Sequence, residues 1–191
     1  MTQIKVGQRV ETRSLDTIQA TRVDIPDSSR MTHIQFRRFV GCPICHLNLR
    51  SFGARHEELV ATGIQEVAVF HSSKKAMLDY KAEAPFALVA DPTKALYAAF
   101  GVDNSLLSIL HPGAWFAAVK GIFTIGPSLP PKGESPLGLP ADFLIARDGR
   151  VIARKYGVHA DDQWTVDEVL DLARQAENPS AGVASKQEGL R

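Results

Sequence analysis

The sequence predicts a single layered α/β domain, and three observations support this. Of the 191 residues, 45% are hydrophobic and 23% are charged, which is typical of one globular domain with a sizeable core. Strand and helix patterns alternate between Met31 and Gly101, as in sheets flanked by helices. Two short apolar runs flank Asp148-Gly149, one of the strongest signals for a hairpin turn. We therefore expect a sheet flanked by helices and completed by an antiparallel hairpin.

The first hundred residues account for most of the expected elements. Residues 6–26 mix short apolar runs with turn residues and predict an appended hairpin. Residues 31–40 carry Ile34 and Phe36 at a period of two, which predicts a strand. Apolar residues then recur at helical spacing from Cys42 until Gly63. The following pattern predicts a strand at residues 64–70, a helix at 74–83, a strand at 86–90 and a helix at 91–101.

The second half of the chain is less regular. Residues 102–139 have no sustained period and are interpreted as an insertion rather than a second domain. Strands are expected at 143–146 and 151–153, and an amphipathic helix begins near Trp164. Residues 179–191 are small or polar and are expected to form a disordered tail. The predicted organisation is one domain at residues 1–178 followed by this tail.

Charge and hydropathy argue against nucleic-acid and membrane partners. Lys plus Arg number 22 against 21 Asp plus Glu, so no net charge attracts nucleic acid or an anionic membrane. The longest apolar stretch, residues 106–126, is interrupted by His111-Pro112-Gly113 and Lys120, whereas a spanning helix needs about 20 apolar residues. The first residues lack the pattern of a secretory signal. A cytoplasmic protein is expected.

The segment Cys42-Pro43-Ile44-Cys45 lies between a predicted strand and a predicted helix. A reactive cysteine needs surroundings that lower its pKa from about 8.5, because the thiolate is the nucleophile. Unpaired amides at a helix start stabilise an anion, and Pro43 suits the first helical turn. Cys42 is therefore expected to be the more exposed and more acidic thiol, and Cys45, one turn later, to resolve a mixed disulfide.

Three further side chains lie near the cysteines. Arg37 and Arg38 occupy alternate positions of the strand, so one should point to each face, either as a solvated strand end or toward the thiols. His46 is interpreted as a helix-surface residue or as a modest modulator of thiolate basicity. Asp142, before the final hairpin, either caps a strand or accepts a hydrogen bond near the thiols, and we favour the cap.

Other interpretations of the two cysteines have less support. If the two cysteines served only as small buried hydrophobic residues, they would not need to lie at the start of a helix. A zinc site needs two more ligands, and none of the six histidines forms a second pair at ligand spacing. Cys42 to His46 also fits the C-x-x-C-H pattern of haem attachment, which normally requires export. We expect redox chemistry with no metal and no cofactor.

The order strand, C-x-x-C, helix, strand, with Pro140 directly before a hairpin and a last helix, resembles the thioredoxin superfamily. The resemblance covers nearly the whole chain. It implies a thioredoxin-like α/β fold whose central mixed sheet is flanked by helices, with an N-terminal hairpin extension and an insertion before the C-terminal hairpin. It also implies that Pro140 is a cis-proline that lies against the dithiol and helps to position substrate.

Within that superfamily the chain resembles the peroxiredoxin, or AhpC/TSA (alkyl hydroperoxide reductase and thiol-specific antioxidant), branch. The length, the extension beginning at Lys5 and the segment 91–101 carry this resemblance. Within that branch, the chain resembles more specifically the peroxiredoxin-like proteins that carry a C-x-x-C motif. In the P-x-x-x-T-x-x-C motif of peroxiredoxins, Arg38, Cys42 and Cys45 occupy the places of the proline, threonine and peroxidatic cysteine. The resemblance implies that Arg38, Pro43 and Pro140 help to position substrate.

These features predict a thiol-disulfide oxidoreductase with an antioxidant role, in which Cys42 attacks first. One alternative is a peroxidase in which Cys45 is oxidised to sulfenic acid and Cys42 resolves it. Another is a thioredoxin-fold binding protein without turnover. The expected partners are a thiol or disulfide protein, a low-molecular-weight thiol or a hydroperoxide. A homodimer is a further hypothesis, since Trp115 and Phe116 make part of the insertion apolar.

Overall fold

The computed structural model describes residues 2–102, 138–159 and 161–178. The predicted insertion therefore lies outside the described residues apart from its two ends. The predicted tail at 179–191 and the apolar insertion residues Trp115 and Phe116 also lie outside them.

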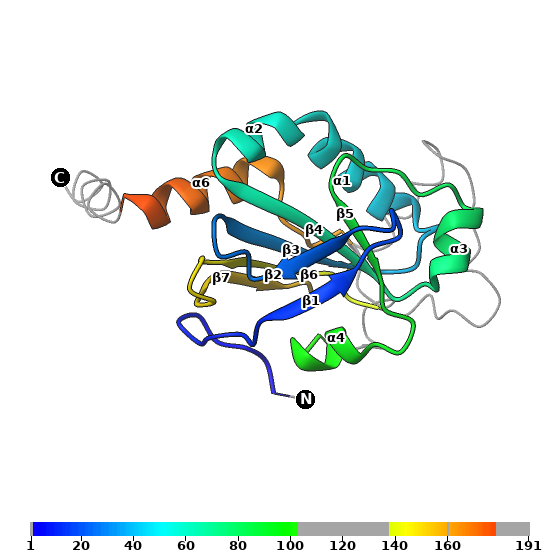
Figure 1. Cartoon of the computed structure of the whole chain (residues 1–191), viewed down its shortest axis with the longest axis horizontal. Coiled ribbons are helices and arrows are strands. Elements are labelled where there is room, and N and C mark those ends of the chain that lie inside the picture. The colour runs from blue at the N-terminus through cyan, green and yellow to red at the C-terminus, as the bar shows by residue number, and fades with distance from the viewer. Residues whose placement is uncertain (1, 103–137, 160, 179–191) are drawn as a thin grey trace.

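A five-stranded mixed sheet forms the centre of the molecule (Figure 1). Its strands, in the order in which they pair, are β5 (Ala87–Ala90), β4 (Ile64–Phe70), β3 (Met31–Arg37), β6 (Ala141–Ile145) and β7 (Val151–Tyr156). β3, β4 and β5 are parallel to one another. β6 pairs antiparallel with β3, and β7 pairs antiparallel with β6. The central strand β3 is buried along its whole length. The predicted mixed sheet with a closing hairpin is confirmed.

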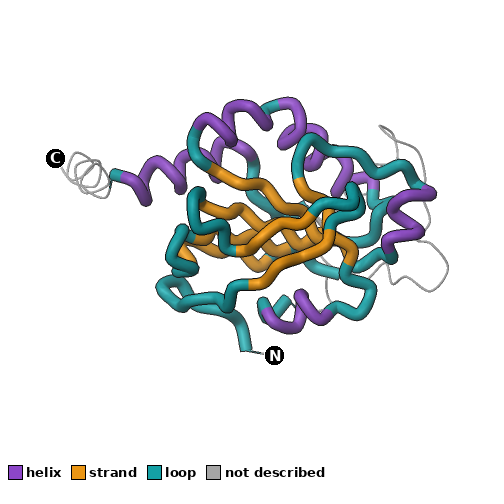
Figure 2. The backbone as a smooth tube through the Cα atoms, viewed as in Figure 1, coloured by secondary structure: helices purple, strands orange, loops and turns teal. Residues whose placement is uncertain are grey.

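Helices cover both faces of this sheet (Figures 1 and 2). On one face lie α1 (Pro43–Ala54), α2 (His56–Ala61) and α6 (Val166–Glu177), and on the other lies α4 (Ala95–Ala99). Each face has its own apolar core, since Phe52 and Leu170 belong to the first cluster and Leu96 and Phe100 to the second. Met77 of α3 (Lys74–Asp79) joins the first core. No helix among the described residues is long and apolar enough to cross a membrane.

The predicted amino-terminal hairpin consists of β1 (Arg13–Asp16) and β2 (Arg22–Ile25), which pair antiparallel as a separate small sheet. Ile25 is buried in the second core, and the Ile18 amide donates to the Leu88 carbonyl at 2.9 Å. The hairpin connection therefore covers the edge strand β5, which would otherwise expose unpaired backbone groups.

Several helices are shorter than the sequence predicts. The single helix expected from Cys42 to Gly63 is divided, because Arg55 has φ −114° and ψ 21° and separates α1 from α2. α3 ends early because Lys81 adopts φ 53°, and α4 begins late because Lys94 adopts φ 59°. A left-handed backbone cannot continue an α-helix. Sequence period predicts that a helix exists, but these local backbone states set where it ends.

Candidate active site

The two cysteines open the helix that follows the central strand. β3 ends at Arg37, and Cys42 is the N-cap of α1 with extended backbone angles. The Cys42 sulfur accepts a hydrogen bond from the Cys45 amide at 3.4 Å. Pro43 occupies the first helical turn, where its missing amide costs no hydrogen bond. The predicted junction of strand, dithiol and helix is confirmed.

The thiols face each other within the protein interior. Both cysteines are free, and their sulfur atoms lie 2.6 Å apart. Each side chain is only 1% exposed, and both belong to a small apolar cluster with Phe39 and Ile44. The expectation that Cys42 is the more exposed thiol is therefore wrong. Phe39 and Ile44 form an apolar cluster with the two cysteines, and neither thiol is exposed.

The surroundings nevertheless give the two thiols different pKa values. The hydrogen bond donated by Cys45 lowers the pKa of Cys42, burial opposes this, and the charge of Arg38 and two backbone amides lower the pKa further, to about 7. Burial, the donated hydrogen bond and the negative charge of Cys42 all raise the pKa of Cys45 well above its ordinary value. Cys42 is the more acidic thiol, as the sequence predicts. The cause is hydrogen bonding and charge rather than exposure.

Arg38 lies just beyond the end of β3 and is partly buried. Its charge lowers the pKa of both thiols, so it acts electrostatically at the dithiol. Its guanidinium carbon lies 5.7 Å from the centre of the Phe39 ring. His46 turns back to the loop before the dithiol, where its Nε2 lies 2.6 Å from the Val40 carbonyl oxygen. Burial lowers the pKa of His46, and the residue is only partly exposed.

Pro140 lies at the same edge of the sheet as the dithiol. Phe36 pairs with Ala141 in the antiparallel register, which places Pro140 level with Arg37. Its carbonyl accepts a hydrogen bond from the Gly157 amide at 2.9 Å and extends the β6–β7 ladder by one pair. The cis state expected for Pro140 is wrong. Among the described residues the cis peptide bond is Ile25-Pro26, and the Leu139-Pro140 bond is trans.

A buried polar network occupies the face of the sheet beneath α1 and α6. His33, Gln35 and Arg37 alternate along β3, and all three are fully buried. They meet two acids from neighbouring strands, Glu66 on β4 and Asp142 on β6. His33 Nδ1 lies 2.8 Å from a Glu66 oxygen, and Arg37 donates to Asp142 at 2.9 Å. The network combines two acids with Arg37 and His33.

This network corrects two expectations about the candidate site. Arg37 is fully buried rather than solvated at a strand end, and Asp142 is an ion-pair partner rather than a strand cap. Arg37 also donates to Asn48 Oδ1 at 3.0 Å, and Asn48 donates to the Trp164 carbonyl at 3.1 Å. The network thereby connects the sheet to the dithiol helix. Polar residues at a period of two usually mark a solvated face, so the sequence carried no signal for this burial.

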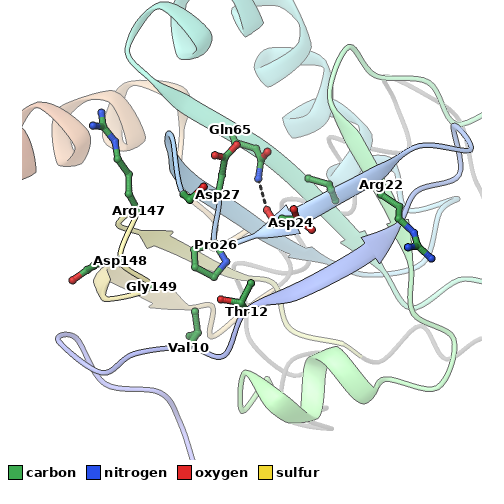
Figure 3. A pocket seen from close by; sticks show the side chains of 12 residues that line it. Val10, Thr12, Arg22, Asp24, Pro26, Asp27, Gln65, Arg147, Asp148 and Gly149 are labelled. Carbon is green, nitrogen blue, oxygen red and sulfur yellow. Dashed lines mark hydrogen bonds between the residues drawn. The ribbon is translucent and has the colours of Figure 1, made fainter.

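A polar cavity lies away from the dithiol, at the other end of the sheet (Figure 3). Asp27 precedes β3, Gln65 is the second residue of β4, and Asp148 lies in the β6–β7 turn, so all three border the amino ends of the parallel strands. Gln65 donates to the Asp24 carbonyl at 2.8 Å, as the dashed line shows. The cavity is therefore not part of the dithiol site.

Comparison with known families agrees with this geometry. Residues 51–159 match the model of the family described as AhpC/TSA antioxidant enzyme, which is more than half of the chain. The chain belongs to the AhpC/TSA family. The predicted resemblance is therefore confirmed, and family membership supports a thiol-dependent oxidoreductase at the level of the family. The matched residues begin after both cysteines, so the dithiol itself is assigned from its geometry.

Solved structures that resemble this chain include peroxiredoxins. Peroxidoxin BcpB from Mycobacterium tuberculosis matches with a TM-score of 0.65 and 16% identity, over 90% of this chain and 97% of that one. The reduced 2-Cys peroxiredoxin of Plasmodium vivax has a TM-score of 0.65 and 13% identity, over 90% and 81%. A cysteine-to-serine mutant of peroxiredoxin 6 from Arenicola marina matches with a TM-score of 0.64 and 14% identity, over 91% of this chain and 74% of that one. These likenesses show the fold. No curated protein matches the chain.

Proposed function

We propose that this protein is a thiol-disulfide oxidoreductase in which Cys42 is the nucleophile and Cys45 the resolving thiol. The observation that carries the proposal is the opposite displacement of the two pKa values. With a pKa of about 7, about half of the Cys42 side chains are thiolates at neutral pH. Cys45 stays protonated and therefore does not compete as the first nucleophile.

The reaction consists of two exchanges. The Cys42 thiolate attacks one sulfur of a substrate disulfide, forms a mixed disulfide and releases the other sulfur as a thiolate, which takes up a proton. Cys45 then loses its proton and attacks the Cys42 sulfur, which breaks the mixed disulfide and releases the second substrate thiol. The substrate disulfide gains two electrons, and the protein dithiol becomes a Cys42–Cys45 disulfide. The 2.6 Å separation of the sulfur atoms supports this second step.

Three neighbouring residues are proposed to assist. Arg38 stabilises the Cys42 thiolate through its charge, and Pro43 begins the helix whose amides surround that sulfur. Pro140 borders the substrate side of the dithiol, at the sheet edge where β3 ends. A dithiol protein or a low-molecular-weight thiol would reduce the disulfide again. Residues 1–178 are proposed to act as one domain.

Single cysteine variants test the proposal. A Cys45→Ser protein mixed with a chromogenic aromatic disulfide should release one equivalent of thiol and retain a mixed disulfide at Cys42. A Cys42→Ser protein should react much more slowly, because burial raises the pKa of the remaining Cys45 thiol and keeps it protonated. The opposite pattern, with trapping at Cys45, would contradict the assignment of the nucleophile.

A peroxidase is the second candidate, because the chain belongs to a family described as antioxidant enzymes. Here the Cys45 sulfur would attack a hydroperoxide, become sulfenic acid and release an alcohol. Cys42 would then form the disulfide with loss of water. The raised pKa of Cys45 weighs against this order of attack. Peroxide reduction by the Cys45→Ser variant at the parent rate would remove Cys45 from the peroxidatic role.

The third hypothesis is a binding protein without turnover. In that case the Cys42–Cys45 pair would not exchange with cellular thiols. The deciding measurement is the reduction potential of the Cys42–Cys45 pair. A value of roughly −270 to −180 mV permits exchange with cellular thiols, as in thioredoxin and protein disulfide isomerase. A pair that does not equilibrate with a glutathione redox buffer would contradict the enzymatic proposal.

A further inference from the structure

The hydroxyl of Tyr97 holds the end of β3, where the chain leads to the dithiol. Tyr97 lies in α4 and is 5% exposed. Its hydroxyl donates to the Arg37 carbonyl and lies 3.0 Å from the Val69 carbonyl oxygen. Arg37 is the last residue of β3, and Val69 is the last but one of β4. Tyr97 therefore ties together the carboxyl ends of two parallel strands.

Two sets of contacts fix the position of the Tyr97 side chain. The Asp91 carboxylate accepts hydrogen bonds from the first amides of α4, those of Ala95 at 3.1 Å and Leu96 at 2.8 Å. The Tyr97 ring makes an edge contact with Phe36 of β3 at a centroid distance of 4.9 Å. Because both the helix and the ring are held, the hydroxyl is a fixed point for the end of β3.

The carbonyl that Tyr97 contacts belongs to the same peptide group as the Arg38 amide. This peptide is trans and planar, so its C=O and N–H point in opposite directions, and holding one fixes the direction of the other. Burial raises the pKa of Cys45, whereas the Arg38 amide hydrogen-bonds to the Cys45 sulfur and lowers that pKa. One peptide group therefore connects Tyr97 to the resolving thiol.

The Arg38 amide matters most after the first exchange. In the reduced protein burial, the hydrogen bond with Cys42 and the charge of Cys42 raise the pKa of Cys45. In a mixed disulfide the Cys42 sulfur has no charge, so burial is opposed by the charge and the amide of Arg38. A hydrogen bond from Tyr97 to the carbonyl of this peptide also polarises its N–H and makes it a stronger donor.

The Tyr97 hydroxyl keeps its proton. Burial, the charge of Asp91 and the charge of a Cys45 thiolate raise its pKa well above the ordinary value. The effect of Cys45 places the Cys45 sulfur within electrostatic reach of the hydroxyl. Tyr97 is therefore a hydrogen-bond donor to the peptide and not a base that deprotonates Cys45.

We propose that Tyr97 is a positioning residue for the resolving step, in which it holds the Arg37–Arg38 peptide with its amide directed at the Cys45 sulfur. In that step the Cys45 thiol releases its proton to solvent, and its sulfur forms a bond to the Cys42 sulfur. The bond between Cys42 and the substrate sulfur breaks, and the substrate leaves as a thiolate. This inference rests on the proposed disulfide exchange and names the group that stabilises the attacking thiolate.

Stopped-flow kinetics with a chromogenic aromatic disulfide separate the two exchanges. Release of the first aromatic thiol reports attack by Cys42, and its rate rises with reagent concentration. Release of the second reports attack by Cys45, and its rate is independent of reagent concentration because both sulfur atoms belong to one molecule. Tyr97→Phe should slow the second release by about fivefold, which corresponds to about 1 kcal/mol for one hydrogen bond, and leave the first nearly unchanged.

Tyr156→Phe is the matched control. The Tyr156 hydroxyl also bridges two backbone groups, since it accepts from the Ile4 amide at 2.9 Å and donates to the Phe100 carbonyl at 2.6 Å. Tyr156 packs against the same apolar core as Tyr97. Its substitution should leave both releases unchanged. Equal slowing of both releases by Tyr97→Phe, or an unchanged second release, would overturn the positioning role.

Two substitutions of Arg38 test the amide itself and do not depend on the folding of Tyr97→Phe. Arg38→Pro removes the charge and the amide, whereas Arg38→Met removes the charge alone. The second release should be about tenfold slower in Arg38→Pro than in Arg38→Met, the effect of losing a hydrogen bond to a charged group. Equal rates of the second release in these two variants would overturn the assignment of the amide.

Hydrogen exchange of the Arg38 amide does not depend on turnover. In the reduced protein this exchange should be faster in Tyr97→Phe than in the parent, and unchanged in Tyr156→Phe. A protein that does not react with the disulfide but shows this pattern would disprove the proposed function and retain the hold of Tyr97 on the peptide. A protein whose two releases keep the parent rates in Tyr97→Phe would retain the function and disprove the positioning role.

Discussion

Raising the pH from about 6 to 10 should destabilise the fold through His33. Burial alone would lower the pKa of this histidine, but the negative charges of Glu66 and Asp142 and their hydrogen bonds outweigh burial and raise it to about 9. The ordinary value is 6.5. A raised histidine pKa stabilises the native state fully below 6.5, and this contribution is lost as the pH rises toward 9.

The expected magnitude follows from the displacement of the pKa. A difference of about 2.5 units at 1.36 kcal/mol per unit corresponds to about 3 kcal/mol of unfolding free energy. Between pH 6.5 and 9 the native state holds one proton that the unfolded state has lost. The free energy of unfolding should therefore fall by about 1.4 kcal/mol per pH unit in that interval.

Urea unfolding at a series of pH values measures this slope. The protein used should be the Cys42→Ser/Cys45→Ser double variant, because Cys42 in the native state and both thiols in the unfolded state would otherwise titrate in the same interval. Addition of His33→Gln should abolish the slope, and addition of His159→Gln, outside the network, should leave it unchanged. A flat profile in the double variant, or an NMR titration of His33 near 6.5, would refute the reasoning.

Three further predictions concern the dithiol, the ion pair and the last helix. The alkylation rate of Cys42 by iodoacetamide should rise with a midpoint near pH 7, and Arg38→Met should move that midpoint upward because a stabilising positive charge is lost; an unchanged midpoint would contradict the role of Arg38. Arg37→Met should lower the unfolding free energy by about 3–5 kcal/mol, since it leaves two buried acids, Glu66 and Asp142, with His33 as their remaining cation in the network. Adding Asp142→Leu should recover much of that loss in denaturant titrations, and an equal or larger loss would argue against the ion pair as the cause. Thr165→Ala should cost about 1 kcal/mol by removing the capping box of α6, as measured by thermal unfolding, whereas no loss would show that the cap is dispensable.

The order of elements was predictable because its signals are local. A period of two identified β3, and the central strand β4 was expected at residues 64–70, where the structure has Ile64–Phe70. Asp148-Gly149 identified the closing hairpin, in which Gly149 adopts φ 83°. Helix ends were less predictable, since Lys81 and Lys94 adopt left-handed backbone angles that neither residue type favours.

Some features of the candidate site could likewise be predicted from the sequence, whereas others could not. The position of Cys42 and Cys45 one turn apart at a helix start, and the greater acidity of Cys42, could be predicted because both depend on neighbours along the chain. The burial of both thiols, and the pairing of Arg37 with Asp142, 105 positions away, could not be predicted because they arise from tertiary contacts. Contacts of this kind depend on which strands pair and in which register. That choice is made by burial of the whole sheet rather than by any local pattern.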